Sequence, residues 1–350
     1  MNQLDRYLAR MFLARFAVTV LALVMLLGVL DALSNADLLP NDHGLTDQLR
    51  YMGLRMPILF DRMMILALLL ALLLTYVGLI RRNELVAIAG AGVSVFGQVR
   101  ALALPVAMAA ILSAVLIDRM TPPVTRALTD WLGPEAVVED GATPQTLWLA
   151  DGDLLVEVGG LRGRTLHDVT LFERGDDGRI MAVTQADTAV AVPEGWTLLQ
   201  ARQIRYDGQP VQVPELWATA QTPHTLRLLL SEPRYLALDD LLRLSRMTGS
   251  GSLPSNAYLV WFMNRLALPF VALGFLMLTV PIMQRFGRHD GGEVPLGIGV
   301  GAGFLFMVVD GMLKTLAESG SVAAATAVAI PAGAVIVTGL WLCVHKTMTS

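Results

Sequence analysis

The sequence predicts a polytopic α-helical membrane protein with six transmembrane helices and an inserted antiparallel, jelly-roll-like β-domain between the third and the fourth. The first observation is composition: 54% of the 350 residues are hydrophobic and only 16% are charged, whereas soluble domains carry about 25% charged residues. The second is a set of long uncharged runs. The third is a polar, turn-rich insert that divides these runs into two groups of three.

Six uncharged runs are the candidate membrane spans. Several fall slightly short of the roughly 20 residues that a transmembrane helix needs, and flanking residues complete them. The basic N-terminus resembles the start of a signal peptide, but the long apolar stretch without a small-residue cleavage site indicates a retained first span. The runs are 16–30, 63–80, 101–117, 266–284, 294–309 and 319–344.

Arginine and lysine near the ends of the spans predict the orientation of the chain. Most of them fall on one side of the predicted bilayer, and the positive-inside rule makes that side cytoplasmic. Both termini are therefore expected in the cytoplasm. The basic residues on this side are Arg6, Arg10, Arg15, Arg81, Arg82, Arg100, Arg285, Arg288 and Lys346.

The connection between the second and third spans is apolar where a loop should be polar. Residues 83–97 predict a short helix, with Asn83 as N-cap and Glu84 in the first turn, where a carboxylate suits the helix dipole. Fusion with the third span would give a helix of about 50 Å, against a hydrocarbon core of about 30 Å, so a break is expected at 97–100. An apolar surface beside water predicts a docking site for another protein, formed by Leu85, Val86, Ile88 and Val93.

The long insert between the third and fourth spans predicts a domain outside the cytoplasm. In residues 118–250 acidic side chains outnumber basic ones, and long segments of this kind are translocated. Between 146 and 218, short runs rich in Val, Leu, Thr and Trp alternate with Asp-Gly and Gly-Gly turn pairs, a pattern typical of antiparallel strands. The clearest strand is predicted over 196–207, and a helix over 236–247 precedes a Gly/Ser-rich hinge.

The sequence lacks the motifs of nucleotide-binding and hydrolytic enzymes. Walker A, H-E-x-x-H and G-x-S-x-G patterns are missing. The five histidines are scattered and Cys343 stands alone, so neither a metal site nor a disulfide within the chain is expected. The chain is expected to be no enzyme and to hold no cofactor. A net charge of -4 without basic tracts also argues against a nucleic-acid partner.

Several polar residues and one glycine-rich run stand out in or beside the spans. Asp31 and Asp310 lie at the outer ends of the first and fifth spans, where they either face protein or water or sit at the interface. Residues 297–303 hold two overlapping G-x-x-x-G patterns, which permit close helix packing or a mobile gate helix. Arg265, just before the fourth span, is expected to snorkel to the interface, with contact to a lipid headgroup as the alternative.

Four short stretches occur in a specific order along nearly the whole chain. They are Leu4-Asp-Arg-Tyr7, Arg82-Asn-Glu-Leu-Val86 with Gly92, Trp261–Pro269, and Gly303-Phe-Leu-Phe306 followed by Asp310. With three spans, a β-domain and three more spans around them, they resemble the LptF/LptG family of lipopolysaccharide export permeases, and the LptG branch more than the LptF branch.

The resemblance implies a set of partners. The chain would pair with an LptF-like permease around a cavity for lipopolysaccharide. A cytoplasmic ATPase dimer like LptB would hold ATP and Mg²⁺, and periplasmic jelly-roll proteins like LptC and LptA would receive the lipid. The chain would lie in the bacterial inner membrane with its β-domain in the periplasm.

The resemblance also implies roles for particular residues. The short helix would insert into a groove of the ATPase, with coupling residues Arg81, Arg82, Glu84, Leu85, Ile88 and Gly92. The first and fifth spans would form lateral gates, with gate or cavity residues Asp31, Gly299, Gly303, Phe304, Phe306 and Asp310. Asp31 stands where family members carry lysine, so the first span is not expected to bind a lipid phosphate directly, because like charges repel.

The resulting domain division has three parts, with a coupling helix at about 83–97 in the first. They are 1–117 with spans one to three, 118–250 with the β-domain, and 251–350 with spans four to six. Three alternatives stay open: an LptF-type subunit or a permease for another amphipathic lipid, an ion-coupled secondary transporter that uses Asp31 and Asp310, and a non-transporting envelope scaffold.

Overall fold

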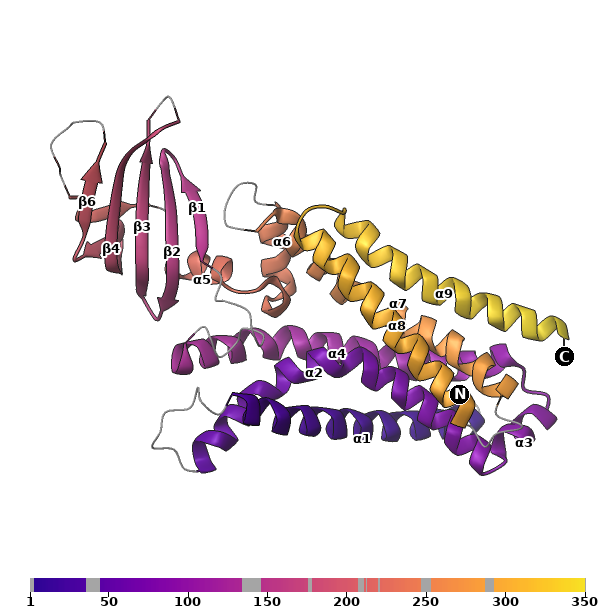
Figure 1. The fold of residues 1–350 in the computed structure, drawn as a ribbon. Helices are drawn as coiled ribbons and strands as arrows, with labels where there is room; N and C mark the ends of the chain where they lie inside the picture. Colours follow the sequence, from indigo (N-terminus) through magenta and orange to yellow (C-terminus); the bar gives the residue numbers. More distant parts are fainter. Residues whose placement is uncertain are drawn as a thin grey trace. The chain divides into compact units, whose positions relative to one another are not determined.

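The computed structural model is mostly helical, with one antiparallel sheet (Figure 1). It divides into two compact units. We call them the helical unit, with described residues of 1–34, 55–121 and 259–350, and the sheet unit, with those of 35–54 and 122–258. The structure describes residues 3–35, 45–133, 146–175, 178–206, 211, 213–219, 221–246, 253–286 and 293–349.

Six helices among the described residues are long and apolar enough to cross a membrane, which confirms the predicted spans. The first five exceed the uncharged runs at both ends, whereas the sixth begins later than its run, at Ala324, and ends later, at Thr349. The longest has 38 residues, about 57 Å at about 1.5 Å per residue. The six are α1 (Gln3–Ser34), α2 (Leu45–Arg81), α4 (Val95–Leu132), α7 (Ser255–Phe286), α8 (Glu293–Glu318) and α9 (Ala324–Thr349).

The short helix α3 (Glu84–Gly90) lies between α2 and α4, as predicted, but it ends earlier than expected. The predicted break at 97–100 is wrong, because α4 already begins at Val95. Gly92 adopts φ +77°, in the left-handed region, and its N–H donates to the Ala89 carbonyl at 3.0 Å. This glycine ends the helix as a C-terminal cap does.

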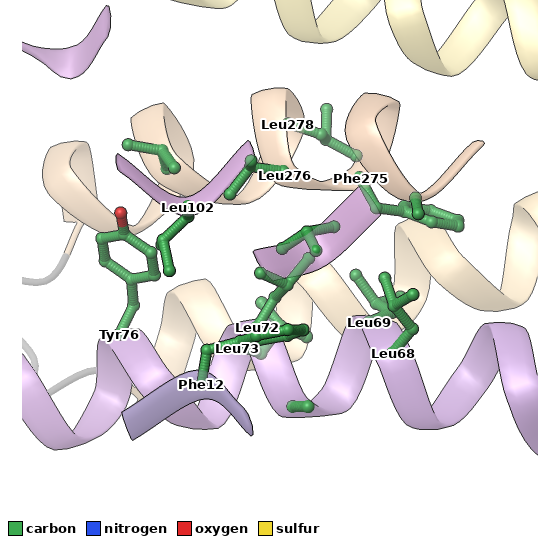
Figure 2. Close-up of a cluster of buried hydrophobic side chains, with 14 of the residues drawn as sticks. Phe12, Leu68, Leu69, Leu72, Leu73, Tyr76, Leu102, Phe275, Leu276 and Leu278 are labelled. Atoms are coloured by element: carbon green, nitrogen blue, oxygen red, sulfur yellow. The ribbon is translucent and has the colours of Figure 1, made fainter. Parts of the chain in front are cut away.

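A large apolar cluster lies in the helical unit, and α2 supplies much of it (Figure 2). Leu72 and Leu73 of α2 are fully buried. The cluster continues into Phe12 of α1, Leu102 of α4 and the α7 side chains Phe275, Leu276 and Leu278. α2 and α7 are the most buried of the six spans, at 61% of the most apolar window in each.

The inserted sheet is antiparallel throughout, as predicted, and its strands pair mostly with their neighbours in the chain. The strand order is β1-β2-β3-β4-β5-β7, and β6 pairs with β4. The strands are β1 (Leu147–Asp151), β2 (Leu154–Arg162), β3 (Thr165–Arg174), β4 (Ile180–Val192), β5 (Gly195–Leu199), β6 (Arg202–Arg205) and β7 (Leu216–Ala218).

The strand predicted over 196–207 is interrupted once. β5 and β6 follow each other along β4 in one register, with Leu199 opposite Thr188 and Gln203 opposite Thr184. Between them Gln200 adopts φ 55°, which L-residues other than glycine rarely take. Residue 207 lies outside the described residues.

Two buried tryptophans face each other across β5 and β7. Trp196 pairs with Trp217 in the register, and both are almost completely buried. Each indole N–H has an acceptor: Trp196 Nε1 donates to the Gln221 carbonyl at 2.9 Å, and Trp217 Nε1 donates to Asp151 Oδ2 at 3.0 Å. A buried indole with a partner costs little, so these rings can anchor the core of the sheet.

Helical segments follow the sheet within the same unit. The predicted helix at 236–247 is confirmed as α6 (Leu238–Arg246), with acidic residues in its first turn and arginines in its last, as the helix dipole favours. A further helix that was not predicted, α5 (Pro223–Leu230), is capped by Thr222, which accepts a hydrogen bond from the Thr225 N–H at 3.2 Å. The predicted hinge after α6 lies largely outside the described residues.

Candidate functional site

The short helix α3 is anchored by one face and exposed on the other. Leu85 and Ile88, three residues apart, are buried in the core of the helical unit, whereas Val86 is 61% exposed. The expected exposed apolar surface is therefore wrong for Leu85 and Ile88, because the helical repeat turns both toward the core. Apart from Val86, the exposed face of α3 consists of alanine and glycine.

Glu84, at the start of α3, is bound by a residue from the first helix. The Tyr7 hydroxyl donates to Glu84 Oε2 at 2.6 Å, across 77 positions of sequence. Arg82 lies nearby, but its Nη1 is 4.0 Å from Glu84 Oε1 and its side chain is 69% exposed. Asn83 adopts φ 59° and occupies the predicted N-cap position, but its side chain makes no capping hydrogen bond.

A second arginine fixes α1 against α2 close to this point. The Arg15 guanidinium donates to the Leu74 carbonyl. Gly78 makes room for it, because a Cβ at this position would collide with the Arg15 side chain. The N-terminal half of α1 is thus held to α2 by a polar contact that a larger residue at Gly78 would block.

At the other end of α1, Asp31 forms a buried ion pair with Arg55 of α2. Arg55 Nε donates to Asp31 Oδ2 at 2.8 Å, and its Nη2 donates to Oδ1. The two side chains are only 4% and 9% exposed. Asp31 is therefore compensated by a cation from the same chain, which the sequence analysis did not foresee because the two residues lie 24 positions apart.

α8 packs against α2 through glycine. A Cβ at Gly299 would collide with Leu73, and one at Gly303 would collide with Leu69, whereas Gly297 and Gly301 face open space. Only one of the two overlapping patterns therefore makes a close helix contact. This packing accounts for the Gly299–Gly303 pattern.

The aromatic residues of α8 divide between its two faces. Phe306 is buried and packs edge-on against Phe275 of α7, with 5.0 Å between ring centroids. Phe304 is 68% exposed, together with its neighbour Leu305. Of the five predicted gate residues on α8, four pack into the helical unit and Phe304 faces outward.

Asp310 belongs to a charged network at the C-terminal half of α8. Lys314, one turn further along, donates to Asp310 Oδ2 at 2.5 Å, and both residues are buried. The Lys314 ammonium also lies 5.4 Å from the Trp261 ring centroid of α7, and Trp261 Nε1 donates to Glu318. The sequence analysis missed Lys314, although the i,i+4 spacing from Asp310 was a usable signal.

Arg265 does not snorkel as predicted. Its Nη1 donates to Asp118 Oδ1 of α4 at 3.1 Å, and its side chain is only 7% exposed. The carboxylate stabilises the guanidinium inside the protein, so the cation need not reach the interface.

The spans differ in how much of their surface the chain itself covers. In the most apolar 18-residue stretch of each helix, only 17% is buried in α1 and 22% in α8, against 61% in α2. These are the two spans expected to act as gates. Among the described residues, no three His, Cys, Asp or Glu side chains gather in a way that could hold a metal ion.

Two triplets of spans, an inserted antiparallel sheet and a short anchored helix after the second span define the architecture of a polytopic membrane protein. The family model for the lipopolysaccharide export system permease LptF/LptG matches residues 6–345, and the chain belongs to this family. It is thus a transporter subunit, in agreement with the resemblance noted in its sequence.

Curated relatives agree with this assignment. The chain is 23% identical over 376 residues to the lipopolysaccharide export system permease protein LptG of Escherichia coli strain K12, and the match covers 98% of both chains. The LptG protein of Escherichia coli O6:H1 strain CFT073 matches to the same extent.

Proposed function

We propose that this chain is the LptG-type subunit of an ATP-driven exporter that extracts lipopolysaccharide from the bacterial inner membrane and passes it toward the outer membrane. Membership of the permease family supports the lipid cargo. The match to LptG over 98% of the chain supports the choice of branch. The termini then lie in the cytoplasm and the sheet unit in the periplasm, as the basic residues beside the spans indicate.

The observation that carries the coupling is the anchoring of α3. Leu85 and Ile88 fix this helix in the core, while Val86 and the exposed side chain of Arg82 remain accessible to a partner. A force on the exposed face of α3 is therefore transmitted to the packed spans, because the buried side chains connect this helix to them. A cytoplasmic ATPase dimer like LptB, which would bind ATP and Mg²⁺, is the partner that would supply the push.

The lipid path would lie along α1 and α8. Both helices expose apolar side chains along most of their length, including Leu21 and Leu26 of α1 and Phe304 and Leu305 of α8. A paired LptF-like permease would face these surfaces across a cavity, and LptC- and LptA-like periplasmic proteins would accept the lipid. Because Arg55 is engaged with Asp31, the α1 end of this subunit is not expected to bind a lipid phosphate directly.

The ion-coupled alternative is less well supported. Asp31 and Asp310 are the carboxylates it would use, and each is held in an ion pair, with Arg55 and Lys314 respectively. Both carboxylates therefore have a structural role in holding helices or a helix turn together.

The test is reconstitution of the full chain with its co-expressed permease and ATPase partners in liposomes that contain lipopolysaccharide. ATP-dependent transfer of lipopolysaccharide to a soluble periplasmic acceptor is expected, with one copy of this chain and one of the other permease in each complex. Transport that follows an ion gradient without an ATPase would contradict the proposal. A complex that binds no ATPase and moves no lipid would indicate a scaffold instead.

A further inference from the structure

The contact between Tyr7 and Glu84 joins two elements that the proposed function treats separately. Tyr7 belongs to the second turn of α1, and Glu84 opens α3. The hydroxyl donates to Glu84 Oε2 at 2.6 Å. A short hydrogen bond to an ionised carboxylate is among the stronger side-chain contacts.

The start of α1 is the part of that helix best placed to receive a displacement. Leu8 and Phe12 are fully buried and Ala9 nearly so, directly after Tyr7. Beyond them the buried residues of α1 are widely spaced, at Thr19, Val24 and Gly28. The helix has 32 residues, about 48 Å at about 1.5 Å per residue. Near its far end the Asp31–Arg55 ion pair holds the helix to α2, so a displacement at the start changes the direction of the stretch between these two attachments.

α3 can deliver such a displacement because it is short and packed. Leu85 and Ile88 are buried. A movement of α3 therefore also moves the core side chains that these two residues contact. Glu84 immediately precedes Leu85. Any shift of α3 must either carry Tyr7 with it or break the hydrogen bond.

The geometry of the carboxylate leaves room for a second contact. Oε2 accepts from Tyr7, whereas Oε1 is 4.0 Å from Arg82, beyond hydrogen-bonding distance. An ionised carboxylate accepts up to about four hydrogen bonds. One oxygen can therefore meet a donor from the ATPase while the other stays bound to α1.

We infer that Tyr7 is a positioning residue that links α3 to α1, so that a movement of α3 is transmitted through the Glu84 carboxylate to the first span. This inference deepens the proposed function and rests on it. The Tyr7–Glu84 hydrogen bond would connect α1 through α3 to the ATPase, separately from the packing of α2 and α4.

The first test uses Tyr7→Phe, which removes the hydroxyl and keeps the ring. The full complex is reconstituted in liposomes with and without purified lipopolysaccharide, and two quantities are measured: the amount of ATPase that co-purifies and the stimulation of ATP hydrolysis by lipopolysaccharide. We expect unchanged co-purification and a fivefold to tenfold loss of stimulation, roughly the effect of one partly exposed hydrogen bond to a charged group.

Two further variants separate transmission from a structural effect. Tyr76→Phe removes another tyrosine hydroxyl of the helical unit, one that donates to Gln98 Oε1 at 3.3 Å, and should leave the stimulation unchanged. Tyr7→Phe combined with Glu84→Ala should lose no more stimulation than Glu84→Ala alone, because both remove the same contact. Additive losses would overturn the inference.

The second test measures movement directly. In a Cys343→Ala background, which removes the single cysteine, spin labels are attached at Ala91→Cys, the C-terminal cap of α3, or at Val29→Cys toward the far end of α1. Both native residues are exposed. With Tyr7 present, ATP should change the label spectrum at both positions. With Tyr7→Phe it should do so only on α3.

The outcomes distinguish the inference from the function beneath it. Wild-type complex that binds no ATPase would contradict the proposed function, and the inference would fall with it. Wild-type complex that is stimulated normally, with Tyr7→Phe behaving identically in both stimulation and label response, would overturn the inference alone.

Discussion

Replacing Lys314 by methionine tests the buried network of α8 most directly. Methionine keeps most of the aliphatic chain and removes the ammonium group, so the change leaves Asp310 without its partner 2.5 Å away. The side chains of the pair are only 11% and 12% exposed, and water can reach the carboxylate only slightly. Lys314→Met therefore creates an almost buried, uncompensated charge.

The size of the effect follows from this burial. Breaking a buried ion pair by removing one partner costs about 3–5 kcal/mol of unfolding free energy. Loss of the contact between the ammonium and the Trp261 ring, 5.4 Å away, adds about 0.5–1 kcal/mol. The double variant Asp310→Leu/Lys314→Met removes both charges together, and replacing a whole buried pair by apolar residues is often neutral. We expect the double variant to recover most of the lost stability.

The assay is denaturant-induced unfolding of the full chain in detergent micelles, compared among the wild type, the two single variants and the double variant. Thr315→Ala is a matched control on the next position of the same helix, where the side chain is exposed. If the double variant is destabilised by the sum of the single changes, the two residues are not coupled and the buried-pair reasoning is refuted.

Three further predictions concern other parts of the helical unit. Glu84→Ala should reduce assembly with the ATPase or coupling to it and leave the membrane fold intact; wild-type transport by this variant would contradict the coupling role. Gly303→Val should destabilise the packing of α8 on α2 by about 1–3 kcal/mol, because its side chain meets Leu69, while Gly301→Val in open space should not; equal melting temperatures would exclude this contact. Asp31→Lys places two cations together beside α2 and should lower thermal stability, and unchanged melting would show that Arg55 does not depend on Asp31.

The sequence predicted the number of spans and the inserted sheet because both follow from strong one-dimensional signals. A span needs a long apolar run, and antiparallel strands need short runs separated by turn residues. Both signals are local. The LptF/LptG family was also accessible from the sequence, because its short motifs occur in order along the whole chain.

The predicted end of α3 is wrong because it was placed from the maximum length expected of a membrane-spanning helix. The chain accepts a helix of 38 residues in α4, so length alone does not force a break. Gly92 does, through its left-handed backbone. Of the three glycines in this segment, the sequence alone did not indicate which one ends the helix.

The partners of the buried charges were missed for a different reason. Arg55 lies before the second predicted run at 63–80, and Asp118 directly follows the third at 101–117. Their partners, Asp31 and Arg265, lie 24 and 147 positions away. A single sequence gives no signal for contacts over such distances, because they depend on which helices become neighbours.

The buried ion pairs can form only at different times during synthesis of the chain. Asp310 and Lys314 belong to the same helix, so they can neutralise each other while that helix enters the bilayer. Arg265 emerges from the ribosome 147 residues after Asp118, a delay of roughly 7–30 s at about 5–20 residues per second. During this interval residues 122–258 of the sheet unit are synthesised, and the ion pair between Asp118 and Arg265 forms only after the fourth span has followed.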